Sequence, residues 1–515
     1  MDENINSIDQ FIQGHLAKYK EKIAFRNCED GGRVSFSQFI DDIKQVSDGF
    51  CKAGYSGETI ILAAENSYSW IVLAMGVLAS GNCLVPVDAE LSDETLKEQA
   101  RFVESSLCVI SQSFESTFEG GFKSVRIHDA VKGEEHLPRC DRKSPKGENK
   151  AAMIVFTSRT MGTQKAVMLS EKNIIAVIRG GNGYVVSEGE TFSMLPLCHT
   201  YAFICGVLGP IGGGETVILN DKLRNFAKNL KSMSPAMMFT VPMVLEKMRG
   251  LVYQGLKDTG KEKAFGRWLK ISGFLMKIGI DVRRKIFKEI IAGFGGRLAV
   301  IVSGGAPIQN DIIDFFHWIG IRVLNGYGIT ECGPLVSVSS NIYKERQKSD
   351  SVGRPIYGCQ VKIDSESETD IGEILVKGDN VMMGYYKAGE ATDQVLVDGW
   401  LRTGDIGRLD HQGLLYVKGR KKNMILADNG KNVYPEEIEG MIKRMTGIED
   451  VIVYQGDGSE IVAEVYVDSL DLDQDRVVER VLVVNDTLPM FAQIARVAVR
   501  KEAFEKTTTQ KIKRR

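Results

Sequence analysis

The stretch RLAVIVSGGAPIQNDIIDFFHWIGIRVLNGYGITE, residues 297–331, decides the fold. Its first six residues form an apolar run of strand length, and SGGAP, residues 303–307, has the composition of a turn. QNDIIDFFHWIG, residues 309–320, carries apolar residues at helical spacing, and IRVLN, residues 321–325, is a second strand-length run. A strand, a helix and a strand in this order predict a parallel pair. Both glycine-bearing loops then leave the carboxyl ends of neighbouring strands, where open parallel sheets bind ligands.

Strand-length apolar runs alternate with helix-length amphipathic stretches through most of the 515 residues. This alternation predicts an α/β fold with largely parallel sheets. After about residue 351 the pattern changes to short alternating segments with Gly and Asp turns, and beyond Arg420 it indicates a smaller unit of strands and two helices. We therefore expect an N-terminal domain over residues 1–420 and a C-terminal domain over residues 421–515.

Composition excludes several classes of protein. The 65 Lys and Arg residues against 67 Asp and Glu give a net charge of −2, which argues against a dedicated nucleic-acid binder. The nine cysteines are scattered without a C-x-x-C pair, so we expect reduced thiols and neither a disulfide framework nor a zinc site. The acidic N-terminus is not a signal peptide, and the longest apolar run, Trp70–Ala79, is too short for a membrane span. These features predict a soluble, cytoplasmic protein.

The loop TSRTMGTQK, residues 157–165, concentrates hydroxyl groups, backbone amides and two cationic side chains after a predicted strand. A polyphosphate needs such hydrogen-bond donors and positive charge. The loop lacks the G-x-x-x-x-G-K-[ST] pattern of a P-loop, and a polar surface turn would have the same composition.

Three further segments could bind parts of a nucleotide. The glycines of residues 303–307 would let a planar base lie against the backbone, with Tyr327 stacked on it. Thr330 and Glu331 offer hard oxygen ligands suited to Mg²⁺, and Asp405 could accept hydrogen bonds from a ribose. Tight turns, a solvated glutamate and a common Gly-Asp turn are the alternative interpretations.

Residues 261–290 carry nine Lys and Arg against three Asp and Glu. The charges are interleaved with Trp268, Leu269, Phe274 and Leu275. This pattern is typical of a basic amphipathic surface that contacts anionic membranes, and also of a solvated helix face.

Taken in order, seven motifs resemble those of the acyl-adenylate-forming family, which includes acyl-CoA synthetases, adenylation domains and luciferase. The resemblance covers nearly the whole chain, and the motif sequences are most similar to those of bacterial long- and medium-chain fatty acyl-CoA ligases. The motifs are FTSRTMGTQKAVMLS (156–170), LPLCHTYAF (195–203), VSGGAPI (302–308), NGYGITECGPLVS (325–337), GWLRTGDIG (399–407), GRKKNMI (419–425) and TTTQKIKRR (507–515).

The resemblance implies a role for each matching residue. The residues implied for the β- and γ-phosphates are Thr157, Ser158, Thr160, Gly162 and Lys165. Those implied for the adenine and its surroundings are Gly304, Gly305, Ala306, Asn325, Gly326 and Tyr327. The remaining roles are Thr330 at the α-phosphate, Glu331 at Mg²⁺, Asp405 and Arg420 at the ribose, Lys422 as hinge, Lys511 as adenylation lysine and His199 near the acyl carboxylate.

The resemblance also implies an architecture and a reaction. It implies a large body of several subdomains with parallel sheets and a small β-barrel-like part, followed by a small mobile α+β domain. The implied enzyme is an AMP-forming acid–thiol ligase that uses ATP, Mg²⁺ and CoA to convert a fatty acid to acyl-AMP and then to a thioester. Two alternatives stay open: loading of an acyl carrier protein in trans, and an impaired adenylate-binding protein. The second is motivated by Arg159, Met161 and Gln164, which stand where the family has Gly, Thr and Pro.

Overall fold

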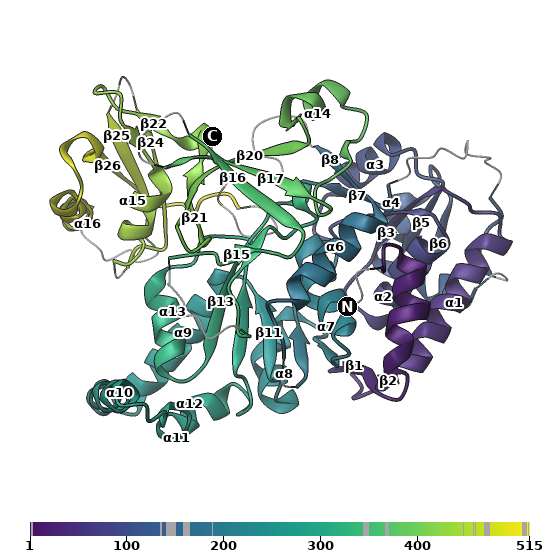
Figure 1. Ribbon diagram of the computed structural model, residues 1–515, viewed down its shortest axis with the longest axis horizontal. Coiled ribbons are helices and arrows are strands. Elements are labelled where there is room, and N and C mark those ends of the chain that lie inside the picture. The colour runs from purple at the N-terminus through teal and green to yellow at the C-terminus, as the bar shows by residue number, and fades with distance from the viewer. Residues whose placement is uncertain are drawn as a thin grey trace. The chain divides into compact units, whose positions relative to one another are not determined.

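The structure is a computed structural model that describes residues 1, 4–133, 136–140, 151–157, 165–187, 189–342, 350–365, 370–445, 447–456, 458, 460–467, 474–506, 512 and 514. The chain divides into two compact units (Figure 1). The first unit comprises Met1–Thr157, Lys165–Gln360 and Lys377–Leu396, and the second comprises Val361–Val376 and Val397–Arg515.

Two sheets form the frame of the first unit, and their central strands are parallel, as the alternating pattern predicts. The nine-stranded sheet has the order β15 (Arg354–Pro355), β14 (Ser337–Val338), β13 (Arg322–Tyr327), β12 (Val300–Ser303), β11 (Met237–Thr240), β9 (Thr191–Ser193), β10 (Val217–Leu219), β1 (Ile23–Asn27) and β2 (Arg33–Ser35). The seven-stranded sheet has the order β18 (Gly384–Tyr385), β8 (Ala166–Leu169), β7 (Met153–Phe156), β4 (Cys83–Pro86), β3 (Thr59–Ala63), β5 (Leu107–Ile110) and β6 (Ser124–Arg126).

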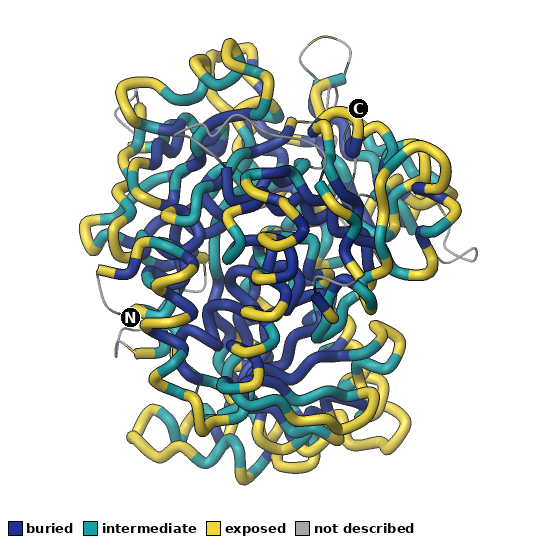
Figure 2. The backbone as a smooth tube through the Cα atoms, turned by 90° about the vertical axis from the view of Figure 1, so that its right-hand side faces the viewer, coloured by how far each residue is buried: buried dark blue, intermediate teal, exposed yellow. Residues whose placement is uncertain are grey.

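Helices pack against both sheets. In Figure 2 the buried segments of the backbone are dark blue and the exposed segments are yellow. The longer helices of the first unit are α1 (Phe36–Lys52), α2 (Tyr68–Ala79), α3 (Asp93–Phe102), α6 (Glu171–Asn182), α8 (Phe226–Met233), α9 (Pro242–Asp258), α10 (Glu262–Lys277) and α13 (Asn310–Trp318). Shorter turns of helix are α4 (Glu115–Phe118), α5 (Ile127–Ala130), α7 (Gly209–Gly212), α11 (Arg283–Ile286), α12 (Lys288–Gly293), α14 (Gly389–Val395), η1 (Gln10–His15), η5 (Tyr201–Leu208) and η7 (Thr330–Cys332).

The decisive stretch folds as the sequence predicts. Strands β12 and β13 pair in parallel, with Ser303 opposite Asn325, and α13 connects them. The helix buries the apolar side chains that repeat at its helical spacing, which are Ile312, Ile313, Phe315 and Phe316. Strand β13 continues two residues beyond the predicted end, to Tyr327, because its last residues pair with the antiparallel strand β14.

The apolar run that is too short for a membrane span is the buried helix α2. Residues Trp70–Leu78 are all buried, and the Ser67 hydroxyl caps the helix by accepting a hydrogen bond from the Trp70 amide. A Cβ on Gly76 would lie 2.4 Å from Val46 of α1, so this glycine permits close packing of the two helices. Among the described residues, no helix has both the length and the apolar character needed to cross a bilayer.

The second unit contains a five-stranded and a three-stranded sheet. The first consists of β16 (Cys359–Asp364), β17 (Gly372–Gly378), β20 (Trp400–Leu409), β19 (Leu396–Val397) and β21 (Leu415–Arg420). Its β16 and β19 edges do not pair with each other in the described part of the chain, so the expected barrel-like part is an open sheet. The C-terminal part contains β22 (Ile425–Leu426), β23 (Asn432–Val433), α15 (Pro435–Ile442), β24 (Asp450–Gln455), β25 (Ile461–Tyr466), α16 (Gln474–Leu482) and β26 (Ile494–Arg500).

Candidate active site

The carboxyl ends of β12 and β13 bring two predicted nucleotide segments together. Gly304, Gly305 and Ala306 follow β12 directly, while Asn325–Tyr327 end the neighbouring strand β13. The buried Ser303 hydroxyl at this edge has no hydrogen-bond partner among the described residues. Glycine-rich backbone at a strand edge has polar groups and few bulky side chains, so a planar nucleotide base can lie against it.

Tyr201 packs against this edge. Its hydroxyl donates a hydrogen bond to the carbonyl oxygen of Val302 (3.1 Å), and burial raises the pKa of the phenol well above its usual range, so it remains a donor. A Cβ on Gly304 would lie 3.0 Å from the Tyr201 ring, and Gly305 has a φ of +81°. Both positions therefore favour glycine for steric reasons. Tyr201 could not be predicted as part of this edge, because nothing in its own segment of sequence marks the contact.

The NGYGITE segment folds back sharply after β13. The Val336 amide donates to the carbonyl oxygen of Tyr327 (2.9 Å). A Cβ on Gly328 would lie 1.8 Å from the carbonyl oxygen of Pro334, so only glycine fits there. This turn places Thr330 and Glu331 in the short helix η7, just beyond the carboxyl end of β13.

Glu331 lies beside a residue that the sequence analysis did not identify. The Tyr385 hydroxyl donates a hydrogen bond to Glu331 Oε1 (3.0 Å), and the Met382 amide donates to the Glu331 carbonyl oxygen (2.8 Å). Lys165 Nζ lies 4.3 Å from the centre of the Tyr385 ring. Strand β18, which carries Tyr385, pairs with β8 directly after Lys165, and this tertiary pairing unites the three side chains.

Lys165 also marks one end of the predicted phosphate loop. The Thr157 amide donates to the Lys165 carbonyl oxygen (2.9 Å), so these two residues pair where strands β7 and β8 meet the loop. The predicted phosphate residues Ser158, Thr160 and Gly162, together with Arg159, Met161 and Gln164, lie outside the described residues.

His199 lies next to acidic and sulfur groups. Its Nε2 is 3.7 Å from Asp88 Oδ2, and one ligand atom from each of Asp88, Cys198 and His199 lies within 4.8 Å of the others. Sequence spacing did not indicate this grouping. Burial, and then Asp88, raise the pKa of the Cys198 thiol well above its usual range.

Asp405, Arg420 and Lys422 form a separate group in the second unit. Strands β20 and β21 place Asp405 opposite Arg420, and Arg420 Nε lies 2.9 Å from Asp405 Oδ1. The Asp405 side chain is only 6% exposed. Burial, Arg420 and Arg514 lower the pKa of Lys422, which follows in the short helix η8 (Lys421–Asn423). The predicted adenylation lysine, Lys511, lies outside the described residues.

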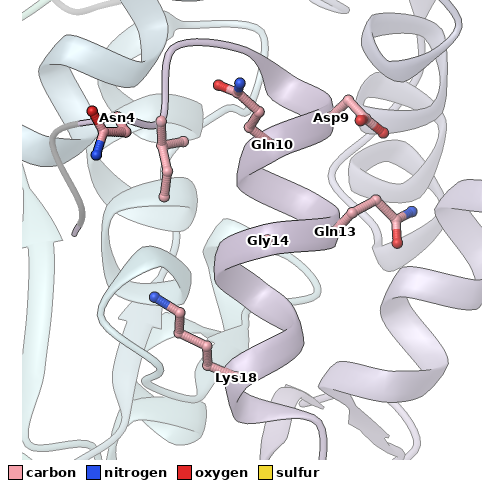
Figure 3. A pocket seen from close by; sticks show the side chains of 7 residues that line it. Asn4, Asp9, Gln10, Gln13, Gly14 and Lys18 are labelled. Atoms are coloured by element: carbon pink, nitrogen blue, oxygen red, sulfur yellow. The ribbon is translucent and has the colours of Figure 1, made fainter.

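The N-terminal segment forms a pocket of about 580 Å³ (Figure 3). Gln10 and Lys18 project from one side of its helix and Asp9 and Gln13 from the other. None of the residues predicted to bind a nucleotide lines this pocket, so we assign it no role in the site.

A family model described as "AMP-binding enzyme" matches residues 12–386. The chain belongs to this family. The resemblance and the prediction of an AMP-forming acid–thiol ligase are thereby confirmed at the level of the family. The chain is 26% identical over 457 residues to the long-chain-fatty-acid–CoA ligase FadD15 of Mycobacterium bovis, covering 82% of this chain and 75% of that protein. It is 26% identical over 502 residues to the long-chain-fatty-acid–CoA ligase of Escherichia coli, covering 86% and 82%.

Solved structures confirm the fold. The o-succinylbenzoate CoA synthetase (MenE) of Bacillus subtilis, in complex with its acyl-adenylate intermediate, has a TM-score of 0.77 at 19% identity and covers 98% of this chain and 96% of its own. ATP-bound MatB from Rhodopseudomonas palustris has a TM-score of 0.75 at 21% identity, covering 97% and 96%. MenE was also solved with ATP and a magnesium ion. The predicted nucleotide and Mg²⁺, and CoA as cosubstrate, are therefore those of the family.

Proposed function

We propose that the protein activates a fatty acid with ATP, forming acyl-AMP and pyrophosphate, and then transfers the acyl group to CoA. The observation that carries this proposal is the contact of Tyr385 with both Glu331 and Lys165, in the unit that bears the glycine edge of β12 and β13. It combines a carboxylate suited to Mg²⁺ with a cation suited to phosphate. The names of the relatives support the choice of a fatty acid and CoA.

In the first step a carboxylate oxygen of the acid attacks the α-phosphorus of ATP, and pyrophosphate leaves. We assign the phosphates to Thr157, Ser158, Thr160, Gly162 and Lys165, and the adenine to the residues Gly304–Ala306 and Asn325–Tyr327. Thr330 and Lys511 would stabilise charge at the α-phosphate, and Asp405 with Arg420 would hold the ribose. Bound Mg²⁺, held by Glu331, would neutralise phosphate charge. His199 would lie near the acyl carboxylate.

In the second step the CoA thiol attacks the mixed anhydride and AMP leaves. One arrangement cannot favour both steps, so we propose that residues 421–515 rotate about Lys422 between them. The rotation would withdraw Lys511 and present the loop 429–433. At this hinge, burial and then the positive charges of Arg420 and Arg514 lower the pKa of Lys422.

Exchange of radiolabelled pyrophosphate into ATP tests the first step. We expect exchange that depends on both a fatty acid and Mg²⁺. Absence of exchange with acids of every chain length would favour the impaired adenylate-binding protein that Arg159, Met161 and Gln164 suggest. Consumption of free CoA after exchange would support the acyl-CoA product, whereas transfer only to an added acyl carrier protein would support the alternative acceptor.

We further propose that α10 contacts an anionic membrane, where long-chain acids reside. Its inner face buries Phe265 in the core, but its outer face leaves Trp268, Ile271 and Phe274 exposed by 47%, 38% and 65%. The C-cap residue Ile278 is exposed by 58%. The spacing of three or four residues puts these side chains on one apolar stripe. Four exposed cations flank it, and none forms an ion pair with another described residue: Lys263, Arg267, Lys270 and Lys277.

An apolar stripe beside unpaired cations complements an anionic lipid surface, because aromatic side chains enter the interface while lysines contact headgroups. In Figure 1, α10 lies at an edge of the first unit with α11 and α12 beside it. An acidic protein partner would also match the charge, but it would not respond to lipid composition.

The variant W268S/F274S is expected to lose binding to phosphatidylglycerol vesicles by at least about tenfold, because two aromatic side chains no longer enter the interface. Co-sedimentation with vesicles of phosphatidylglycerol and of phosphatidylcholine measures this loss. The control variant L223S/M490S removes two other exposed apolar side chains and should bind like the wild type. Equal binding to both lipids, or no binding of the wild type, would overturn the membrane proposal.

We also propose that the protein is cytoplasmic. All nine cysteines lie in the described part of the chain and none forms a disulfide there, which supports a reducing compartment.

A further inference from the structure

The described end of the chain is held on the second unit by Arg514. Its Nη2 lies 2.5 and 2.6 Å from the two carboxylate oxygens of Glu439 on α15. Its Nη1 donates to the carbonyl oxygen of Val453 on β24 (3.1 Å), and the Val453 amide in turn donates to Glu439 (2.6 Å). The two charged side chains are only 24% and 15% exposed. Such a shielded, charge-assisted contact fixes both position and orientation.

A second contact holds the chain eight residues earlier. Lys506 Nζ lies 2.6 Å from a carboxylate oxygen of Asp450, at the start of β24, and the backbone of Lys506 pairs with Ile512 in an antiparallel bridge. Lys506 is thus held on β24, and Arg514 is held on β24 and α15. Lys511 lies between these two residues in the sequence, directly before Ile512.

The same helix is connected to the proposed hinge. Glu436, one turn before Glu439 on α15, accepts a hydrogen bond from the Asn423 side chain in η8 (2.6 Å) and lies 3.8 Å from Arg514 Nη2. A Cβ on Gly419 would lie 2.4 Å from Glu436, so this carboxylate packs directly on the end of β21. Helix α15 therefore contacts both Asn423, next to the proposed hinge residue, and Arg514, three residues after Lys511 in the sequence.

We propose that Arg514 and Glu439 are positioning residues, which fix the C-terminal segment on α15 so that Lys511 acts in adenylation. The inference rests on the proposed function of Lys511 and adds to it the residues that hold it. A rigid hinge movement can deliver a lysine only if the lysine is fixed to the moving part. Without Arg514, the chain would lose the contact that follows Lys511. Ordering Lys511 would then add an entropic cost to the adenylation step but not to the thioester step.

The test compares both half-reactions in the full chain. Arg514→Gln and Glu439→Gln are expected to slow acyl-AMP formation from free acid by about 10- to 100-fold, the range seen when supporting residues of a site are removed. Thioester formation from supplied acyl-AMP should stay within about twofold of the wild type, because that step does not use Lys511. Arg514→Lys retains the charge but not the planar fork, so it should restore part of the lost rate.

The matched control is Arg500→Gln. Arg500 pairs with Glu464 in the same unit at 3.3 Å and has a similar exposure of 26%. Its other described contacts, with the Glu502 carbonyl oxygen and the Phe504 ring, lie before Lys506. It should leave both half-reactions unchanged. Equal losses in both half-reactions of Arg514→Gln, with a lowered Tm, would show a purely structural pair and overturn the proposal, as would wild-type adenylation. If Lys511→Ala itself spared adenylation, the proposed role of Lys511 would fail first.

Discussion

Replacing Lys511 by alanine is expected to reduce acyl-AMP formation from free acid by at least about 10²- to 10³-fold, the cost of removing one preorganised donor from a developing oxyanion. Thioester formation from supplied acyl-AMP should remain close to the wild-type rate. The two steps separate because Lys511 is proposed to act at the α-phosphate while the carboxylate displaces pyrophosphate. In the second step the CoA thiol attacks the acyl carbon and AMP leaves after the rotation has withdrawn Lys511.

Pyrophosphate exchange measures the first half-reaction, and release of AMP from synthetic acyl-AMP in the presence of CoA measures the second. Lys501→Ala, which changes an exposed lysine earlier in the same unit, is the control and should affect neither. Parallel losses in both half-reactions would contradict the assignment of Lys511 to adenylation.

Glu331→Gln should have the second-largest effect. We expect it to lower adenylation by about 10²-fold and to raise the Mg²⁺ concentration needed for half-maximal rate, because the neutral amide is a poorer ligand for a hard cation. Glutamine keeps an oxygen that can accept the hydrogen bond from Tyr385, which is 3.0 Å in the wild type, so the fold around η7 should persist. Initial rates over a Mg²⁺ series at saturating ATP, with Tm as a check of folding, measure the change.

Tyr385→Phe is the matched control for this experiment. It removes the hydrogen bond to Glu331 but keeps the carboxylate and the ring beneath Lys165. Its effect on the Mg²⁺ requirement should therefore be much smaller than that of Glu331→Gln. A Mg²⁺ dependence of Glu331→Gln that matches the wild type would remove Glu331 from the metal site.

Local pattern was sufficient where the chain follows a general rule of topology. Parallel strands joined by a helix place their carboxyl ends together, so the adjacency of Gly304 and Asn325 could be predicted from one 35-residue stretch. The helix α13 followed from apolar spacing for the same reason. The roles of individual residues at this edge came from the order of the motifs and their resemblance to a family.

Contacts between distant segments could not be predicted in this way. Tyr385 meets Glu331 only because β18 pairs with β8, and Arg514 meets Glu439 across 75 positions of sequence. No periodicity within either segment encodes such a pairing. The grouping of Asp88 with His199 was missed for the same reason, since the two lie on loops that follow different strands.

The crowding at Gly328 has a practical consequence for variant surveys. A methyl group there would be 1.8 Å from a backbone oxygen, so alanine would inactivate the protein without removing any contact to substrate. In a deep mutational scan, substitutions at this position would lose as much function as substitutions at Glu331. The loss would come from misfolding and not from a missing catalytic group. Separating the two requires the abundance of each variant to be scored beside its growth phenotype.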